Sequence, residues 1–499
     1  MSQIIIYHTN DLHGRLSTHD ENEKSIGIDK IAKVVNLSLL QNKNTFWFNS
    51  GDFQSGTPRM NYAPMEELIN TLNSTHLNAS VTGNHDYNFG FDHLYELLKK
   101  LNMYILSANT VDKFTKLPAL LPYIIYEVDV EQNDYISENS NDSTLDNIKI
   151  GVFGISTPET AYKTNPNNVR NVDFLNPILT SRYMVDLLSR NCDIIIALTH
   201  LGLDASSEYT SKKLAEEVKG IDLILDGHSH TSLEQGLWVN NTLIAQTGAH
   251  GEFLGKIILD IENRKIQNMQ ASLINEEQVD NLIKTVDTYI EHKIEVIDEI
   301  TNLALNQKVA YNNKFLSGER ELVRRRECEL GNFIADACRY MTKANISIIN
   351  GGNIRTDLKQ GDLTRKDIIT VCPFENQIQT YEIAGLKIKE MLEHSIANAP
   401  DSSFGGFLHI SGAKFTYDPK KQQGNKVIDI FIGNERIDYD KTYSISITDF
   451  QAVGGDNYTM LMNLKKIGEF GTLENMFIYY LTHVDAKEYH YELGRIRVL

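Results

Sequence analysis

The sequence predicts an α/β protein of two domains joined by a helix, and three observations support this fold class. The 499 residues exceed what one hydrophobic core usually holds, so two domains are expected. The first half of the chain alternates short apolar runs with amphipathic stretches, which is typical of a layered α/β domain. A helical stretch without Gly or Pro separates this half from a second α/β region.

The elements follow one another in this order along the chain. From Ile4 to about Ala271, apolar runs such as IKIGVFGIS and DIIIALTHLG predict strands, and stretches such as IDKIAKVVNLSLL predict helices. Residues 131–147 are polar and without periodicity, and we interpret them as a solvated loop. Residues 275–300 have the spacing of a connecting helix. We expect a first domain at 1–271, a linker helix region at 272–305 and a second domain at 306–499.

The charge balance restricts the possible partners of the chain. It contains 66 Asp and Glu against 48 Lys and Arg, which gives a formal net charge of −18. Such an acidic chain is poorly suited to a polyphosphate backbone, so we expect no long nucleic acid as partner. An acidic substrate is compatible only where metal ions or a few arginines supply local positive charge. No segment has the pattern of a membrane span or a signal peptide, so we expect no membrane partner and a cytoplasmic location. Nothing in the sequence indicates an oligomeric state.

Five polar clusters follow apolar runs of the first domain, and their side chains suit a metal site. In chain order they are Asp11 with His13, Asp52, Asn84 with His85, His200, and His228 with His230. Open α/β sheets place their sites at strand ends, where these clusters stand. Imidazole mixed with carboxylate suits Zn, Mn, Fe or Co, whereas Mg and Ca prefer oxygen ligands alone. We expect two divalent ions, with Mn or Zn as the first choice and Fe or Co as alternatives.

The spacing of these residues suggests how two ions share them. Residues two apart on a strand share a face, so Asp11 and His13 can bind one ion. Asp52 lies on a predicted tight turn and can bridge two ions about 3.5 to 4 Å apart. The second ion would be completed by Asn84, His200 and His228, and His230 would return to the first ion. A single histidine at a strand end is more often structural, and we interpret the other ten, including His250, in that way.

The order DLHGRL, GDFQSG, GNHDYNFG, THLG and DGHSH resembles the calcineurin-like metallophosphoesterase superfamily. The DLHGR start, together with a second domain, is similar to its 5′-nucleotidase family, of the bifunctional UDP-sugar hydrolase/5′-nucleotidase type. The resemblance extends from Ile4 to about Tyr458. It implies a four-layer α/β-β/α sandwich joined by a helix to a C-terminal α/β substrate domain. It also implies that one metal ion is held by Asp11, His13, Asp52 and His230, and the other by Asp52, Asn84, His200 and His228.

His85 is the expected catalytic side chain beside the metal ions. Two ions that share Asp52 can bind phosphate oxygens and activate a water for in-line attack, so no protein nucleophile is needed. His85 directly follows Asn84 and is placed to stabilise the leaving oxygen and to donate a proton. Members of the family have an aspartate three residues later, where this chain has Asn88. The Asn88 amide oxygen can accept a hydrogen bond but carries no charge, so a weaker acid is expected unless Asp86 substitutes.

The second domain contains the residues that would bind a nucleotide. The resemblance implies that Arg326 and Arg355 bind phosphate and that Asn350 is a polar group of the pocket. It also implies that Phe374 and Phe450 stack on the base and that Asp456 accepts the ribose hydroxyls. Guanidinium groups match phosphate geometry and supply the positive charge that the acidic chain otherwise lacks. Stacking between two phenylalanines tolerates any base, although core packing is the alternative for both rings. We interpret Arg324 and Arg325 as a solvated charge run.

The predicted function is metal-dependent hydrolysis of nucleoside 5′-monophosphates to nucleoside and phosphate. UDP-sugars and nucleoside diphosphates are related substrates under the same interpretation. One alternative is a 2′,3′-cyclic-nucleotide 2′-phosphodiesterase/3′-nucleotidase, because the same pocket residues suit both enzymes. A second alternative is a nucleotide-binding protein with weakened catalysis, because Asn88 replaces the expected aspartate.

Overall fold

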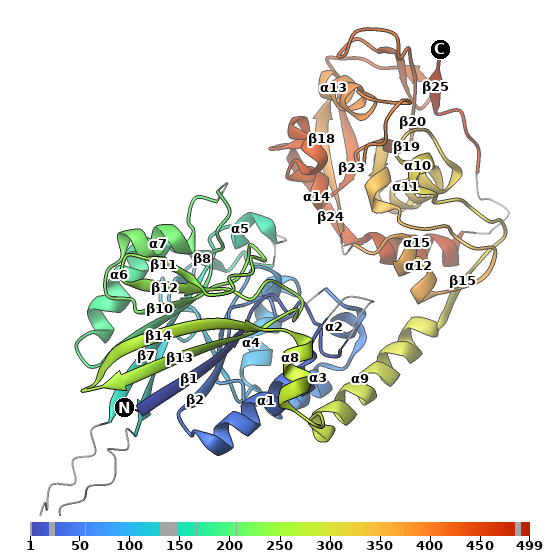
Figure 1. The fold of residues 1–499 in the computed structure, drawn as a ribbon. Coiled ribbons are helices and arrows are strands. Elements are labelled where there is room, and N and C mark those ends of the chain that lie inside the picture. Colours follow the sequence, from blue (N-terminus) through green and yellow to red (C-terminus); the bar gives the residue numbers. More distant parts are fainter. Residues whose placement is uncertain are drawn as a thin grey trace, which may run out of the picture. The chain divides into compact units, whose positions relative to one another are not determined.

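The computed structural model describes residues 2–18, 25–54, 56–129, 147–164, 168–205, 207–374, 376–484 and 491–499. The chain forms two compact α/β units, Met1–Thr301 and Asn302–Leu499 (Figure 1). The predicted two-domain α/β architecture is thereby confirmed, and the finer boundaries at 271 and 305 stay a prediction. The predicted loop at 131–147 lies outside the described residues except for Asn147. None of the described helices combines the length and the apolar character needed to cross a membrane.

Two six-stranded sheets form the centre of the first unit. The first sheet contains, in spatial order, β14 (Lys265–Ile274), β13 (Leu254–Glu262), β1 (Ser2–Thr9), β2 (Thr45–Asn49), β3 (Ala79–Val81) and β4 (Tyr104–Leu106). The second contains β11 (Leu237–Val239), β12 (Thr242–Ala245), β10 (Leu223–Leu225), β9 (Ile194–His200), β7 (Ile148–Ser156) and β6 (Tyr123–Val128). Two short strands, β5 (Thr110–Asp112) and β8 (Val172–Phe174), pair separately.

Alternation along the strands packs the two sheets against each other and covers their outer faces with helices. In β1, Ile4 and Ile6 belong to the core between the sheets, whereas Tyr7 belongs to the core under the helices. The outer face of the first sheet packs against α1 (Ile28–Gln41), α3 (Met65–Asn73), α4 (Phe91–Leu98), α8 (Glu276–Leu282) and α9 (Thr288–Asn306). The second sheet packs against α6 (Pro177–Leu188) and α7 (Ser211–Glu217) (Figure 1). The result is the predicted four-layer sandwich.

Parallel pairing brings the site-bearing loops of each sheet to one edge. Strands β1, β2 and β3 are neighbours and run parallel, so their carboxyl ends lie at the same edge of the first sheet. Strands β7, β9 and β10 are also parallel neighbours in the second sheet. Four of the five polar clusters follow β1, β2, β3 and β10, and His200 is the last residue of β9. Strand ends of open α/β sheets are where ligands usually bind.

The predicted connecting helix is two helices, so that expectation was wrong. The first, α8, begins with a capping box of Asn275 and Gln278, and Ile283 at its end has extended backbone. The second, α9, begins at Thr288 because the Asp287 carboxylate accepts hydrogen bonds from the N–H groups of Tyr289 and Ile290. A carboxylate that caps a helix start interrupts the helix without Gly or Pro.

The second unit is built around a five-stranded sheet. Its spatial order is β19 (Leu408–Ser411), β16 (Ile346–Asn350), β23 (Thr442–Thr448), β18 (Gln377–Ala384) and β24 (Lys465–Thr472). One face packs against α11 (Glu329–Thr342), α12 (Arg365–Val371) and α15 (Leu473–His483). The other packs against α13 (Gly385–Ser395) and a sheet of β22 (Glu435–Arg436), β21 (Val427–Ile432), β20 (Ala413–Tyr417) and β25 (Ile496–Val498). A further pair joins β15 (Lys308–Asn312) to β17 (Gly361–Thr364).

Candidate active site

The loops of the first unit hold five of the predicted metal ligands in left-handed backbone. The residues with positive φ are Asp11 (49°), His13 (46°), Asp52 (52°), His228 (79°) and His230 (52°). This conformation is uncommon for residues other than glycine and costs about 1–3 kcal/mol per residue. Such backbone is found most often at functional sites, where the surrounding structure holds it in place.

Asp11 and His13 do not lie on a strand, so the reason given for their pairing was wrong. Strand β1 ends at Thr9, and the two residues belong to the loop that follows. The N–H of Asp11 donates to Gly51 O at 3.0 Å, and the N–H of His13 donates to Asp52 O at 2.9 Å. Pairing with the neighbouring loop, rather than strand geometry, therefore places both side chains at the site.

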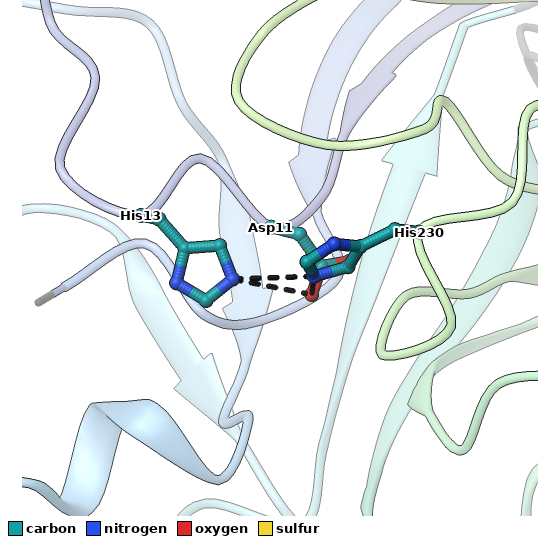
Figure 2. Close-up of side chains that lie close together, drawn as sticks. All are labelled: Asp11, His13 and His230. Atoms are coloured by element: carbon teal, nitrogen blue, oxygen red, sulfur yellow. Dashed lines mark hydrogen bonds and ion pairs between the residues drawn. The ribbon is translucent and has the colours of Figure 1, made fainter. Parts of the chain in front are cut away.

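Two groups of side chains of the metal-ligand type meet at this edge. In the first group, His230 Nε2 lies 3.3 Å from Asp11 Oδ1 and 3.3 Å from His13 Nε2. Figure 2 shows these three side chains pointing toward one another. In the second group, His200 Nε2 lies 3.1 Å from Asp52 Oδ2 and 3.9 Å from Asp11 Oδ1. The two groups share Asp11, and Asp52 Oδ2 also lies 4.0 Å from His13 Nε2, so Asp52 faces both groups.

The residues present fit divalent cations, because several buried ligand atoms have no hydrogen-bond partner among the described residues. These atoms are Asp11 Oδ1, Asn84 Oδ1 and His200 Nε2. Buried polar atoms are normally paired, so three such atoms together favour a bound cation. Nitrogen and oxygen donors in this mixture suit the transition metals named above.

The remaining atoms of these side chains are held by the backbone and by neighbouring amides. His200 Nδ1 donates to Ser50 O at 2.7 Å, so Nε2 is the ring nitrogen that can bind an ion once it has lost its proton. Asp11 Oδ2 accepts from Asn10 Nδ2 at 2.8 Å and from the N–H of His228 at 2.9 Å. Asp52 Oδ1 accepts from the N–H of His85 at 2.8 Å. Each side chain is therefore oriented before any ion binds.

Two glycines allow these side chains to approach the backbone. A Cβ at Gly83 would lie 2.1 Å from Asp52 Oδ1. A Cβ at Gly51, where φ is 88°, would lie 2.6 Å from His200 Nδ1. Both contacts are too close for a side chain, so glycine is required at each position.

The charges at the site shift the pKa values of its buried groups. Burial lowers the pKa of His200, but the carboxylates of Asp52 and Asp11 outweigh it and raise the value to about 10. Burial raises the pKa of Asp52, but the charge of His200 outweighs this effect and holds the pKa of Asp52 well below its usual range. The same pair of carboxylates attracts a divalent cation.

Asp86 is a supporting residue of the site, because its carboxylate binds the backbone around Asp52 and Gly83 and not the His85 ring. Its carboxylate accepts the N–H groups of Asp52 at 3.0 Å, Gly83 at 2.8 Å and Gln54 at 3.1 Å. Burial, and then the charge of Asp52, raise the pKa of Asp86 to about 7. The suggestion that Asp86 substitutes for the expected aspartate is therefore wrong, because its oxygens bind the loop around Asp52.

Asn88 contacts His85, but in the direction opposite to the one expected. The Asn88 amide nitrogen lies 3.1 Å from His85 Nδ1, and the amide oxygen accepts from Thr164 Oγ1 at 3.2 Å. Since the Asn88 amide oxygen accepts the hydrogen bond of Thr164, the amide N–H group faces the His85 ring. A ring that accepts at Nδ1 carries its proton on Nε2. His85, which begins the short 3₁₀ helix η2 (His85–Tyr87), lies with its ring centroid 5.2 Å from that of His13.

Two further residues of this edge were missed by the sequence interpretation. Glu159 is buried, and its Oε2 lies 3.1 Å from Nε2 of His228, which stands outside both groups of ligands. His250, interpreted as structural, has its ring centroid 5.5 Å from that of His13 and 5.8 Å from that of His230. Glu159 has no recognisable motif, whereas His250 follows a strand and a Gly-Ala turn, the same signal that marked the other clusters.

Four of the six predicted pocket residues lie in two neighbouring pairs, Asn350 with Asp456 and Arg355 with Phe374. Asn350 Nδ2 donates to Asp456 Oδ2 at 2.7 Å. The Arg355 guanidinium lies 5.4 Å from the centre of the Phe374 ring. Phe450 packs over Gly455, where an added Cβ would lie 2.5 Å from the ring. The side chains of Phe374 and Phe450 are 44% and 43% exposed, so core packing does not explain them.

The arginines near the pocket differ in their surroundings, and the predicted phosphate contacts of Arg326 and Arg355 stay a prediction. Arg326 is exposed, and within the part of the chain that the structure describes its side chain makes no hydrogen bond to the other pocket residues. Arg324 is half-buried, and its charge interacts with Arg355 and Asp456. Burial, and then the charges of Arg320 and Arg355, lower the pKa of Arg324. The interpretation of Arg324 as a solvated charge is therefore wrong, and it joins the pocket group.

Comparisons with known proteins match both units. Residues 4–232 match the calcineurin-like phosphoesterase family, and residues 305–463 match the 5′-nucleotidase C-terminal domain. The trifunctional nucleotide phosphoesterase protein YfkN of Bacillus subtilis is 28% identical over 512 residues, which covers 92% of this chain and 32% of that protein. The chain therefore spans about a third of the length of this relative.

Two other relatives match over most of their own length. A 5′-nucleotidase of Vibrio parahaemolyticus is 26% identical over 502 residues, which covers 91% of this chain and 84% of that protein. The solved structure of a candidate 5′-nucleotidase from Staphylococcus aureus aligns with a TM-score of 0.74 at 20% identity and covers 100% of both chains. This last likeness shows the shared fold.

Proposed function

Because the chain belongs to the 5′-nucleotidase family of calcineurin-like phosphoesterases, we propose that it hydrolyses nucleoside 5′-monophosphates to nucleoside and phosphate. One observation carries the proposal, namely the unpartnered ligand atoms of Asp11, Asn84 and His200 buried together at the strand ends. In the matched phosphoesterase family such a site is a metal-dependent phosphoester hydrolase site. Relatives named 5′-nucleotidase support the nucleotide as substrate.

We assign the ions to the residues predicted from the sequence, with Mn or Zn as the first choice. One ion would be held by Asp11, His13, Asp52 and His230, and the other by Asp52, Asn84, His200 and His228. When bound, the ions supply positive charge for the phosphate and activate water. The chain's own contribution is orientation: Ser50 O fixes the His200 ring, and Asp86 fixes the loop of Asp52.

His85 serves this reaction as a hydrogen-bond donor in the proposal. With Nδ1 facing the Asn88 amide nitrogen, the ring offers Nε2–H to phosphoryl or leaving oxygen. A donor of this kind stabilises negative charge as it develops on oxygen. A neutral amide behind the ring stabilises a positive ring less than a carboxylate would, so His85 contributes less here than in relatives with the aspartate.

The second unit supplies the nucleotide pocket in this proposal. Phe374 and Phe450 stack on the base, and Asp456, oriented by Asn350, accepts the ribose hydroxyls. Arg355, with Arg326 and the half-buried Arg324, supplies positive charge for phosphate. UDP-sugars and nucleoside diphosphates fit the same pocket chemistry, since the base and ribose contacts are unchanged. The cytoplasmic location inferred from the sequence stays a prediction.

The test is phosphate release from AMP, UMP, UDP-glucose and 2′,3′-cyclic AMP, with and without Mn or Zn. His200→Ala should abolish release and weaken metal binding in calorimetry, whereas His76→Ala, which changes an exposed histidine, should leave both unchanged. Release from AMP or UMP that needs metal and His200 supports the proposal. Preference for the cyclic substrate would move the chain to the phosphodiesterase alternative. No release with either metal would leave the nucleotide-binding alternative.

A further inference from the structure

A small cavity lies behind the metal-site loops of the first unit. Its volume is about 160 Å³. Its walls include Leu12, Phe53 and Phe89, which stand directly after Asp11, Asp52 and Asn88 in the sequence. Leu68 of α3 and Leu97 of α4 also line the cavity. The lining is mainly apolar and contains no Lys or Arg, so it lacks the positive charge that usually binds phosphate.

One polar side chain in this cavity lacks a partner. Gln54 lines the cavity and is 5% exposed. Its backbone N–H donates to Asp86 Oδ1 at 3.1 Å, which fixes the residue on the Asp52 loop. Its side-chain Nε2 is buried and has no hydrogen-bond partner among the described residues. Buried amide donors are normally paired, so the site presents one unused N–H to whatever fills the cavity.

We propose that this cavity binds a small molecule that has an apolar ring and one hydrogen-bond acceptor, which receives the N–H of Gln54. The volume supports a ligand of one ring, because an apolar cavity of about 150 Å³ binds benzene. Asn61 on its wall is exposed, which gives the ligand a route from solvent. The ligand site is distinct from the nucleotide pocket in the second unit and does not depend on the proposed hydrolysis.

Two ring compounds of similar size test the proposal on the full chain. Cyclohexanone has the acceptor and methylcyclohexane lacks it. We expect both to bind the parent protein in saturation-transfer NMR and to raise its Tm, with cyclohexanone binding more tightly. Gln54→Leu keeps the size of the side chain but removes the N–H. This substitution should weaken the binding of cyclohexanone about tenfold, which is the effect of losing one hydrogen bond, and should leave the binding of methylcyclohexane unchanged.

A second variant locates the binding. Ala63→Leu places a larger side chain on the cavity wall and should weaken the binding of both compounds. A cooperative unfolding transition of this variant, measured without ligand, shows that it is folded. The proposal is overturned if neither compound binds the parent, or if cyclohexanone keeps its advantage in Gln54→Leu. It is also overturned if both compounds bind folded Ala63→Leu as tightly as the parent.

Discussion

Replacing Asn88 by aspartate should raise the rate of phosphate release about tenfold at neutral pH. In the parent, the Asn88 amide nitrogen lies 3.1 Å from His85 Nδ1, and Thr164 Oγ1 lies 3.2 Å from the amide oxygen. An aspartate carboxylate in the same place can accept both the ring N–H and the Thr164 hydroxyl. The ring then carries a proton on each nitrogen and is stabilised as a cation next to the leaving oxygen.

The expected size follows from the difference between two kinds of hydrogen bond. A neutral hydrogen bond contributes about 0.5–1.5 kcal/mol, and one to a charged group contributes about 1.5–3 kcal/mol. The difference of about 1.4 kcal/mol corresponds to a tenfold change in rate when it is realised only in the transition state.

The assay is initial-rate phosphate release from AMP with saturating Mn or Zn, comparing Asn88→Asp with the parent. Asn88→Ala is the control, because it removes the contact to His85 without adding charge, and its kcat should not exceed that of the parent. Metal affinity should stay the same in both variants, since the ligand atoms are unchanged. A kcat for Asn88→Asp equal to the parent value would refute the reasoning, and His85 would then be a structural neighbour of the metal site.

Three further changes test other parts of the structure. Gly51→Ala should lower both metal affinity and Tm, because its Cβ would lie 2.6 Å from His200 Nδ1. The left-handed backbone at this position alone costs about 1–3 kcal/mol for a residue other than glycine. Calorimetry measures the metal affinity, and thermal unfolding measures the Tm. Phe450→Ala should raise the KM for AMP by about 5- to 150-fold, the loss of one stacked base, with unchanged metal affinity. Burial raises the pKa of Asp449 to about 6, so the folded chain holds this proton more tightly than the unfolded chain, and the unfolding free energy falls as pH rises from about 4 to about 6. Asp449→Asn should therefore be more stable than the parent by up to about 3 kcal/mol at pH 8 and by little at pH 4, as measured by urea unfolding. An equal difference at both pH values would contradict this assignment.

The place of the metal site in the fold could be predicted from the sequence because strand periodicity is a strong signal. Apolar runs ending before Asp11, Asp52 and Asn84 became three parallel neighbouring strands of one sheet. His200 is itself the last residue of a strand in the second sheet. Parallel strands end at a common edge, so the order of the motifs was enough to bring these residues together.

The local backbone could not be predicted in the same way. An Asp-x-His spacing suits one face of a strand and also suits a loop, and only hydrogen bonds to residues 51 and 52 decide between them. Those bonds join segments about forty residues apart, so no local pattern contains them. The prediction of a single linker helix was wrong for a related reason. Periodicity predicted one helix, whereas the Asp287 carboxylate caps the start of a second helix.

Residues that reach the sites from distant segments were also missed. Glu159 contacts His228 from a loop without any motif, and only tertiary packing brings the two together. Arg324 stands in a run of three arginines that looks solvated, yet it is half-buried and its charge interacts with those of Arg355 and Asp456. The direction of the Asn88 contact depends on Thr164, which lies 76 residues away in the sequence.

The distribution of charge indicates why both metal ions and arginines are needed. Residues 302–499 contain equal numbers of acidic and basic side chains, so the whole formal charge of −18 belongs to the first unit. The field of the first unit therefore repels a nucleotide phosphate, and its site residues add the buried carboxylates of Asp11 and Asp52. Two divalent ions reverse that sign locally. The neutral second unit can present Arg355 and Arg324 without a competing acidic excess, which agrees with the proposal that the first unit carries out the phosphate chemistry and the second binds the nucleotide.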